Sequence, residues 1–180
     1  LDNINQAQVN RRSGVTFASA LRAILRQDPD IIMVGEVRDE ETVELAIRAA
    51  LTGHLVFSTI HTNDSAAGFT RLLNWGMEPF LITSTVKGIL AQRLVRKLCK
   101  ECREKHMVEP SELERFGLEV DEAMEFYKAV GCLSCRNTGY QGRIGLFELI
   151  RMNNEIADLV MEQRPGHVIG EKAIESGMFS

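Results

Sequence analysis

The chain has 180 residues, of which 44% are hydrophobic and 26% are charged, and its formal net charge at pH 7 is −4. These values are typical of a globular domain, exclude a wholly disordered chain and give no whole-chain electrostatic basis for binding nucleic acid. No apolar run approaches the roughly 18–20 residues that span a bilayer, and the first residues lack the features of a signal peptide. The composition therefore predicts a soluble, cytosolic protein.

Strand and helix patterns alternate over residues 1–98. Apolar residues recur at helical spacing over 16–27, and this helix ends before Pro29 because a residue that precedes proline disfavours helical dihedral angles. The continuous apolar run at 31–34 is typical of a buried parallel strand. The next expected elements are a helix over 40–51 capped by Asp39, a strand over 55–60, a helix over 63–73 and a helix over 79–98. This alternation predicts a parallel α/β sheet.

The pattern changes at Cys99. From there to about residue 145 the chain is charged, contains all four cysteines and has no comparable apolar run. Short helices are expected in this stretch at 111–116 and 121–130, and two more after it at 153–163 and 166–175. The sequence therefore predicts three parts, which are an α/β piece (1–98), a cysteine-bearing element (99–145) and a small helical subdomain (146–180).

The cysteines form two Cys-x-x-Cys pairs separated by 29 residues: Cys99 with Cys102, and Cys132 with Cys135. Two residues between thiolates let one turn direct both sulfur atoms at a single ion, and two such turns complete a tetrahedral zinc site. Disulfides or unrelated free thiols are the alternatives, and the cytosolic character of the chain disfavours disulfides. Because four protein ligands leave no open position, the expected Zn²⁺ is structural rather than catalytic.

A carboxylate stands directly after the first predicted strand. Glu36 follows residues 31–34, and ligands of α/β folds bind at the carboxyl ends of parallel strands. The second strand ends near Thr59 and His61, which brings a hydroxyl group and an imidazole to the same edge. There Glu36 can orient a water molecule or Mg²⁺ next to a nucleotide phosphate. The alternative is local, because an acidic residue after a strand often only caps the next helix.

His54 precedes the second strand, so it is expected at the opposite end from Glu36. It follows the expected helix end at Gly53, where an imidazole also interacts favourably with the helix dipole. His54 and His61 flank the strand rather than adjoin each other, and a metal site that they share is not expected.

Four segments, taken together, resemble the ATPases that assemble bacterial type IV pili and drive type II secretion. Residues 25–39 resemble the Walker B region of that family, and residues 51–64 resemble its histidine box. Residues 90–99 and 139–149 match the segments that flank its tetracysteine zinc element. The four segments occur in the family's order and the resemblance covers essentially the whole chain.

The resemblance implies a hexameric, RecA-like motor that hydrolyses ATP with Mg²⁺ at the cytoplasmic face of the inner membrane. Its partners would be an inner-membrane platform protein and cytoplasmic domains of the secretion or pilus machine, without nucleic acid. By similarity, Glu36 is the Walker B carboxylate that positions Mg²⁺ or the attacking water, and Arg38 belongs to the same nucleotide-binding loop. His54 and His61 match the histidine-box pair, with His61 nearer the γ-phosphate, and Thr59 is a lesser catalytic contributor. The four cysteines match the zinc ligands.

One departure from the family pattern concerns the phosphate-binding loop. The family's loop ends in Gly-Lys-Ser/Thr, and this sequence contains no such motif; its Lys87-Gly88 has the reverse order and falls in an expected helix. Phosphoryl transfer depends on positioning and charge stabilisation, so most of the catalytic apparatus is missing. We therefore expect the C-terminal portion of a longer ATPase, inactive by itself, with a sheet that lacks strands and an edge that associates.

Other functions remain open. A non-enzymatic zinc module could dock on an inner-membrane platform protein through the apolar side chains between the cysteine pairs, or these could instead form a small core over the zinc. These side chains are Leu113, Phe116, Leu118, Phe126 and Tyr127. A retraction motor of the same superfamily is disfavoured, because by resemblance such motors generally lack the tetracysteine element. The basic residues near Cys99 lack interleaved aromatic residues, which disfavours nucleic-acid binding.

Overall fold

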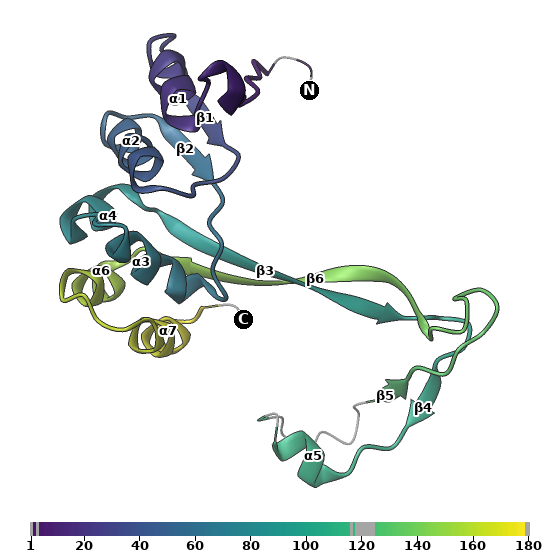
Figure 1. Cartoon of the computed structure of the whole chain (residues 1–180). Coiled ribbons are helices and arrows are strands. Elements are labelled where there is room, and N and C mark those ends of the chain that lie inside the picture. Colours follow the sequence, from purple (N-terminus) through teal and green to yellow (C-terminus); the bar gives the residue numbers. More distant parts are fainter. Residues whose placement is uncertain (1, 3, 116, 118–124, 179–180) are drawn as a thin grey trace. The chain divides into compact units, whose positions relative to one another are not determined.

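The structure, a computed structural model, describes residues 2, 4–115, 117 and 125–178 (Figure 1). The chain divides into two compact units. Unit 1 comprises Leu1–Gln92 and Phe147–Ser180, and unit 2 comprises Arg93–Leu146. The strands in the described residues form three two-stranded sheets, and the two long strands of one sheet run from unit 1 into unit 2. No helix in the described part of the chain is long and apolar enough to cross a membrane.

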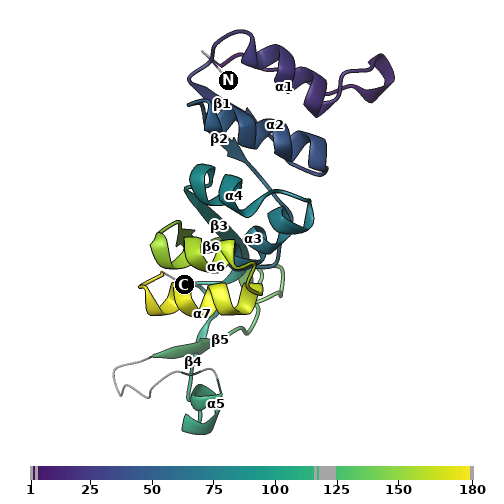
Figure 2. The same cartoon turned by 90° about the vertical axis from the view of Figure 1, so that its left-hand side faces the viewer.

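Unit 1 has an α/β architecture that follows the predicted alternation. A 3₁₀ turn at Arg11–Ser13 precedes the first helix. The elements that follow in the first half of the chain are α1 (Phe17–Leu25), β1 (Ile31–Val34), α2 (Glu40–Leu51), β2 (Leu55–Ser58), α3 (Ser65–Asn74) and α4 (Pro79–Thr85). The C-terminal part adds α6 (Asn154–Met161) and α7 (Gly166–Glu175), which lie side by side (Figure 2).

Side-chain caps explain where four of these helices begin. The side chains of Thr16, Asp39, Asp64 and Asn153 each accept a hydrogen bond from the backbone N–H three residues later. Such a bond satisfies one of the N–H groups that a helix N-terminus leaves without an intrahelical partner. The helix starts predicted at residues 16 and 39 are thus confirmed.

β1 and β2 form a parallel pair, as predicted, in which Ile31 lies opposite Leu55 and Val34 opposite Ser58. Only one face of this pair is covered. Ile32 and Val34 are buried in the core, whereas the alternating residues Ile31 and Met33 are 61% and 71% exposed. The buried strand expected at 31–34 is therefore buried on one face only, because none of the described residues covers the second face.

The core of unit 1 is continuous across its helices and the inner face of β1. Its largest fully buried apolar side chains come from six elements and are Leu21, Phe69, Ile82, Ile150, Ile156, Val160 and Ile169. Close helix approaches contribute to this packing: a Cβ atom at Gly166 would lie 3.1 Å from the Thr70 Oγ1 atom of α3. The residues of the C-terminal helices are thus part of the same core as the first α/β elements.

The helix expected over 79–98 is wrong in its second half. α4 ends at Thr85, and β3 (Gly88–Leu98) pairs with β6 (Tyr140–Arg151). The Met152 N–H donates to the Lys87 carbonyl at 3.0 Å, and the Cys99 N–H donates to the Gly139 carbonyl at 2.9 Å, so the strands are antiparallel. A Cβ atom at Gly88 would lie 2.9 Å from the Ile150 carbonyl oxygen, and glycine permits that approach.

Two consequences follow from this strand pair. The Lys87-Gly88 dipeptide lies at the start of a strand rather than inside a helix. The C-terminal stretch begins with a strand before its two helices, because β6 extends to Arg151. Leu90, Leu94 and Leu98 have a spacing that fits a helix, but the same spacing also occurs in a strand whose residues differ in exposure. Pairing with a distant strand decides the structure here.

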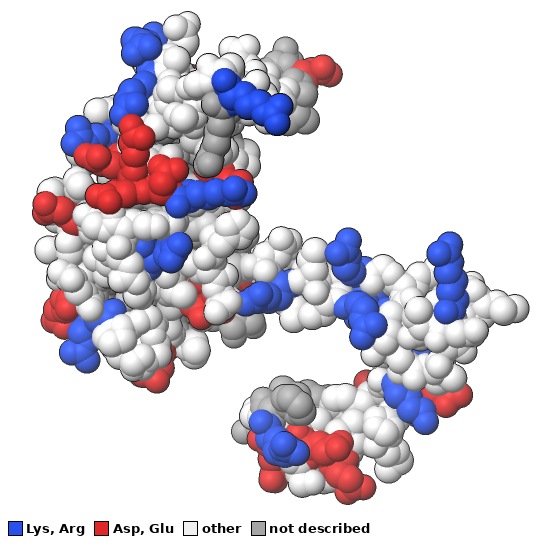
Figure 3. All heavy atoms as spheres, viewed as in Figure 1, with Lys and Arg blue, Asp and Glu red and all other residues white. Residues whose placement is uncertain are grey.

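Unit 2 contains β4 (Glu104–His106), α5 (Pro110–Glu114) and β5 (Phe126–Lys128). β4 and β5 are antiparallel, with Glu104 opposite Lys128. The helix expected over 111–116 is present as α5, whereas 126–128 of the helix expected over 121–130 is a strand, and 121–124 lie outside the described residues. Figure 3 shows acidic side chains gathered over α5, and the exposed Glu109, Glu112 and Glu114 contribute to them.

Candidate functional site

The carboxyl ends of β1 and β2 carry two loops that are joined by hydrogen bonds. The Val37 N–H donates to the Thr59 carbonyl at 2.9 Å, and the Thr59 hydroxyl donates to the Gly35 carbonyl at 2.7 Å. Because the strands are parallel, both loops leave the same edge of the sheet. Thr59 therefore lies where the sequence predicted it, and the described contacts of its side chain hold the two loops together.

Glu36 is the central side chain at this edge, between Arg38 and His61. Its Oε1 atom lies 2.5 Å from the Arg38 guanidinium, and its Oε2 atom lies 3.2 Å from His61 Nε2. The hydrogen bond from Arg38 lowers the pKa of Glu36; partial burial opposes this, and the bond to His61 adds to the lowering. The structure thus holds an ionised carboxylate at the edge, in contact with an imidazole that is 83% exposed.

His54 does not join this group. It precedes β2 and lies at the opposite end of that strand, where its Nδ1 atom is 2.9 Å from the Ala49 carbonyl and 3.2 Å from the Thr52 hydroxyl. These contacts are at the C-terminus of α2, in agreement with the alternative that His54 interacts with the helix end. The structure therefore brings Glu36, Arg38, Thr59 and His61 together and leaves His54 apart.

A cavity of about 310 Å³ opens at the same edge. It is lined by Val37, Arg38, His61, Arg71 and Trp75. Sequence reasoning missed Arg71 and Trp75, which lie at the end of α3. Arg71 falls in the helix predicted over 63–73, and Trp75 follows four residues later. This spacing was the available signal, because residues i and i+4 of a helix face the same side.

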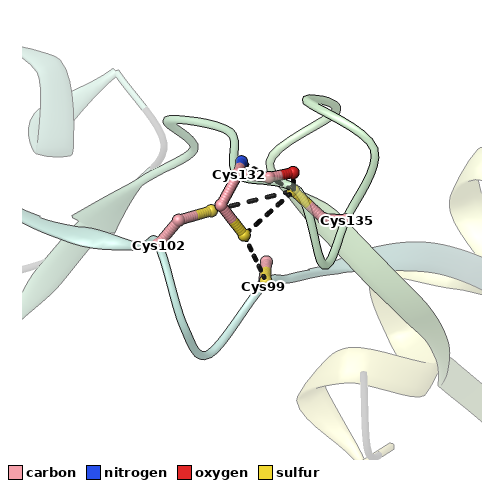
Figure 4. Close-up of side chains that lie close together, drawn as sticks. All are labelled: Cys99, Cys102, Cys132 and Cys135. Atoms are coloured by element: carbon pink, nitrogen blue, oxygen red, sulfur yellow. Dashed lines mark hydrogen bonds between the residues drawn. The ribbon is translucent and has the colours of Figure 1, made fainter.

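The four cysteines of unit 2 converge on one point, as Figure 4 shows. Cys99 and Cys102 follow β3, and Cys132 and Cys135 precede β6. Their sulfur atoms all lie within 4.8 Å of one another. Three of the sulfur–sulfur distances are 3.9 Å (Cys99 to Cys132), 3.8 Å (Cys102 to Cys135) and 3.8 Å (Cys132 to Cys135).

These distances fit a tetrahedral metal site. Sulfur atoms at about 2.3 Å from a central Zn²⁺ form a tetrahedron with edges of about 3.8 Å. Separations near 3.8 Å are also far longer than the S–S bond of about 2.05 Å in a disulfide. The donor set therefore fits Zn²⁺, and the predicted convergence of both cysteine pairs is confirmed.

Backbone N–H groups are directed at two of the sulfur atoms. Cys135 accepts from the N–H groups of Cys132 and Gly139, each at 3.2 Å, and Cys102 accepts from the N–H of Gly131 at 3.3 Å. Burial raises the pKa of Cys135, but the two N–H donors together with contacts to the Cys132 and Cys102 side chains outweigh this effect and lower it to about 6. Burial dominates at Cys102 and raises its pKa to about 12. Donors of this kind stabilise thiolates, the form that binds metal.

Two arginines that flank the first cysteine pair in the sequence stack on tyrosine rings that flank the second pair. The Cζ atom of Arg96 lies 3.9 Å from the ring centroid of Tyr140, and that of Arg103 lies 4.4 Å from that of Tyr127. Leu113 belongs to α5, which lies between β4 and β5 in the chain, and its side chain is buried. At this residue the structure favours a small core rather than an exposed docking surface. Phe116 and Leu118 lie outside the described residues.

Comparison with known proteins identifies the family. The family model described as "Type II/IV secretion system protein" matches residues 1–178. The chain belongs to this family. The resemblance stated from the sequence is thereby confirmed, and the α/β fold of unit 1 agrees with it.

Three relatives are identical to this chain at nearly half of the aligned positions. The type II secretion system ATPase E of Vibrio cholerae is 47% identical over 175 residues, 97% of this chain and 34% of its own length. The type IV pilus assembly ATPase PilB of Thermus thermophilus is 48% identical, over 99% of this chain and 20% of its own length. The type II secretion system protein HxcR of Pseudomonas aeruginosa is 49% identical, over 100% of this chain and 35% of its own length. The chain thus spans about a third or less of the relatives it matches.

Solved structures also include similar folds. The pilus retraction motor PilT, solved with bound ADP, is 31% identical with a TM-score of 0.59, over 88% of this chain and 36% of that protein. The ATPase DotB of Legionella pneumophila has a TM-score of 0.60 over 95% of this chain and 37% of its own, at 24% identity, which supports the fold alone. The chain therefore has an α/β fold found in ATPases.

Proposed function

We propose that this chain is part of a hexameric, RecA-like ATPase that couples ATP hydrolysis to the assembly of a pilus or a secretion pseudopilus. The observation that carries the proposal is the contact between Glu36 and His61 at the carboxyl edge of a parallel strand pair. Nucleotides bind at this edge in α/β folds. The names of the relatives, type II secretion and type IV pilus assembly ATPases, support the same function.

Glu36 positions Mg²⁺ or the attacking water in this proposal. Its carboxylate is ionised at neutral pH, and the hydrogen bond from Arg38 lowers its pKa further below the ordinary value. An ionised carboxylate is what either task needs. His61 donates to the γ-phosphate or reports its loss, since its ring is exposed and contacts Glu36. Mg²⁺, when bound with ATP, neutralises charge that develops on the phosphates.

The remaining site residues hold the loops around Glu36 and His61, and the end of α2, in place. Arg38 binds nucleotide. It also positions the loop after β1 through its ion pair with Glu36. Thr59 fixes the two loops relative to each other through its hydrogen bond to Gly35. His54 contributes from the far end of β2 by securing the end of α2, which packs beside that strand.

The proposal includes a division into residues 1–98 (motor core), 99–145 (zinc element) and 146–180 (C-terminal subdomain). The zinc element holds structural Zn²⁺ through Cys99, Cys102, Cys132 and Cys135, whose sulfur atoms fit a tetrahedron. The motor works in the cytoplasm, against an inner-membrane platform protein and cytoplasmic domains of the machine, without nucleic acid. The 180-residue chain is inactive alone, because it has no Gly-Lys-Ser/Thr loop to hold the phosphates.

Phosphate release from ATP tests this proposal. The longer protein that carries this chain should hydrolyse ATP, and Glu36→Gln should lower its turnover by about a hundredfold or more. The matched control is Glu41→Gln, which removes an exposed carboxylate of α2 that pairs with Arg22. Unchanged turnover in the Glu36 variant would contradict the proposed role. Turnover by the 180-residue chain that Glu36→Gln abolishes would contradict its inactivity.

A second candidate function is that of a non-enzymatic zinc module that docks on an inner-membrane platform protein. It is favoured by the compactness of unit 2 and by the exposed acidic group on α5, composed of Glu109, Glu112 and Glu114. Reversing these three charges should abolish capture of the platform protein's cytoplasmic part in a pull-down assay. Unchanged capture would dismiss this surface.

A further inference from the structure

The cavity beside Glu36 contains one charge that no assigned role uses. Arg71 reaches it from α3, whereas Arg38 and His61 reach it from the loops after β1 and β2. Arg38 is paired with Glu36 at 2.5 Å. Among the described residues, no carboxylate lies within ion-pair distance of Arg71. Arg71 therefore brings to this cavity a permanent positive charge that no described carboxylate neutralises.

The guanidinium group of Arg71 is held in place by an aromatic ring. Its Cζ atom lies 4.6 Å from the ring centroid of Trp75, one helical turn further along. Trp75 is itself partly buried against the core of unit 1. A cation–π contact of this kind is attractive and limits the freedom of a long side chain.

Stacking leaves the hydrogen-bonding edge of the guanidinium available. Its N–H groups form a planar fork whose geometry matches pairs of phosphate oxygens. A side chain that is already oriented loses less conformational entropy when it binds. The cavity thus combines an oriented, unpaired fork with the exposed imidazole of His61.

We propose that Arg71 is a phosphate-binding residue, held by Trp75, that binds the terminal phosphates of a polyphosphate ligand beside Glu36 and His61. The proposal deepens the proposed function and depends on it in one respect, namely that the natural source of the phosphates is a nucleotide. The role of Trp75 is positioning, because it acts through the guanidinium of Arg71.

The chain provides its own probe, because Trp75 is its only tryptophan. Tripolyphosphate is titrated into the 180-residue chain while Trp75 emission is recorded, and calorimetry gives the dissociation constant independently. A ligand that binds Arg71 changes the environment of the ring, so we expect a saturable change in emission. Arg71→Gln should weaken binding about tenfold or more, since it removes a charge-assisted hydrogen-bonding fork. Arg48→Gln, an exposed arginine of α2, should leave the affinity unchanged.

Three results would overturn the proposal. They are an unchanged affinity in the Arg71 variant, an emission change that KCl reproduces at the same ionic strength, and equal affinities for orthophosphate and tripolyphosphate. These measurements need no turnover, so they separate this proposal from the proposed function. If Glu36→Gln leaves ATP hydrolysis by the longer protein unchanged, the nucleotide assignment fails while an Arg71-dependent affinity for tripolyphosphate still stands.

Discussion

The Nε2 atom of His61 lies 3.2 Å from the Oε2 atom of Glu36, although the two residues are 25 positions apart. The parallel pairing of β1 with β2 accounts for this contact, because it directs the loops after both strands to one edge. The other oxygen of Glu36 is held by Arg38. One carboxylate thus joins both loops, and its charge state determines whether the two contacts persist.

Arg38→Gln should raise the pKa of Glu36 toward its ordinary value. The hydrogen bond from Arg38 is the largest cause of the lowered pKa, so this variant should have a larger effect than His61→Gln. Because the folded-state pKa is lowered, the contribution of the pair to stability is present above the ordinary carboxyl pKa and is lost as the pH falls through the lowered value. Carboxyl carbon chemical shifts measured against pH give the pKa directly. The control is Arg22→Gln, whose partner is Glu41, and an equal shift of Glu36 in that variant would contradict the assignment.

Glu148→Ala should destabilise unit 1 by about 1–3 kcal/mol. The Glu148 carboxylate of β6 accepts hydrogen bonds from both the backbone N–H, at 2.7 Å, and the hydroxyl of Ser65 at the start of α3. Ser65 is fully buried, so truncation removes the acceptor of its backbone N–H and leaves its hydroxyl only the weak Met178 sulfur acceptor at 3.9 Å. Urea unfolding measures the loss. Glu148→Gln keeps an acceptor and should lose less, and Glu162→Ala, at an exposed position, should lose little. Equal losses in all three variants would contradict this role.

The elements that the sequence predicted well are those with local signals. Asp39 and Asn153 cap their helices through their own side chains, and the apolar spacing within α2 and α7 indicates which face is buried. The two cysteine pairs are equally local, because each Cys-x-x-Cys turn defines half of a site. Their convergence followed from the chemistry of a metal ion that prefers four sulfur ligands.

The features that sequence reasoning missed depend on partners far along the chain. β3 was predicted as a helix because its apolar spacing allows either structure, and only its pairing with β6, more than forty residues later, decides for a strand. Arg71 was missed because its spacing from Trp75 is compatible with an ordinary helix surface. Its place in a cavity depends on how α3 packs beside the loop of Val37 and Arg38, which no local pattern encodes.

Met33→Lys should reduce self-association of the 180-residue chain. The outer face of the β1–β2 pair exposes four large apolar side chains, which are Ile31, Met33, Leu55 and Phe57. Contiguous exposed apolar surface promotes association, and a charge placed on it opposes association. Size-exclusion chromatography with light scattering, over a range of concentrations, measures the mass. Leu133→Lys is the control. Leu133 is 92% exposed in unit 2, so this substitution adds the same charge away from the β1–β2 face. A monomeric unsubstituted chain at every concentration would contradict the prediction.

Purified chain should contain about one zinc ion, and Cys135→Ser should lose it. Cys135 is buried and accepts two backbone N–H groups, so a hydroxyl in its place is a poor ligand in a site shaped for a thiolate. Because protons compete with the metal for the thiolates, zinc should be held at neutral pH and released as the pH falls. Metal analysis after dialysis at each pH measures this. Ser134→Ala, between two of the ligands, should retain the metal, and a zinc content near zero in the unsubstituted chain would contradict the site.

Removal of the zinc should loosen unit 2 and leave the core of unit 1 intact. Metal binding and folding are coupled in small domains, and unit 2 has few buried apolar side chains of its own among the described residues. The core cluster of unit 1, which runs from Leu21 to Ala173, contains none of the cysteines. Hydrogen exchange after treatment with a chelator should therefore accelerate in β4 and β5 and remain unchanged in α6 and α7. Equal acceleration in both units would show that the zinc stabilises the whole chain, whereas no acceleration in unit 2 would show that its fold does not depend on the metal.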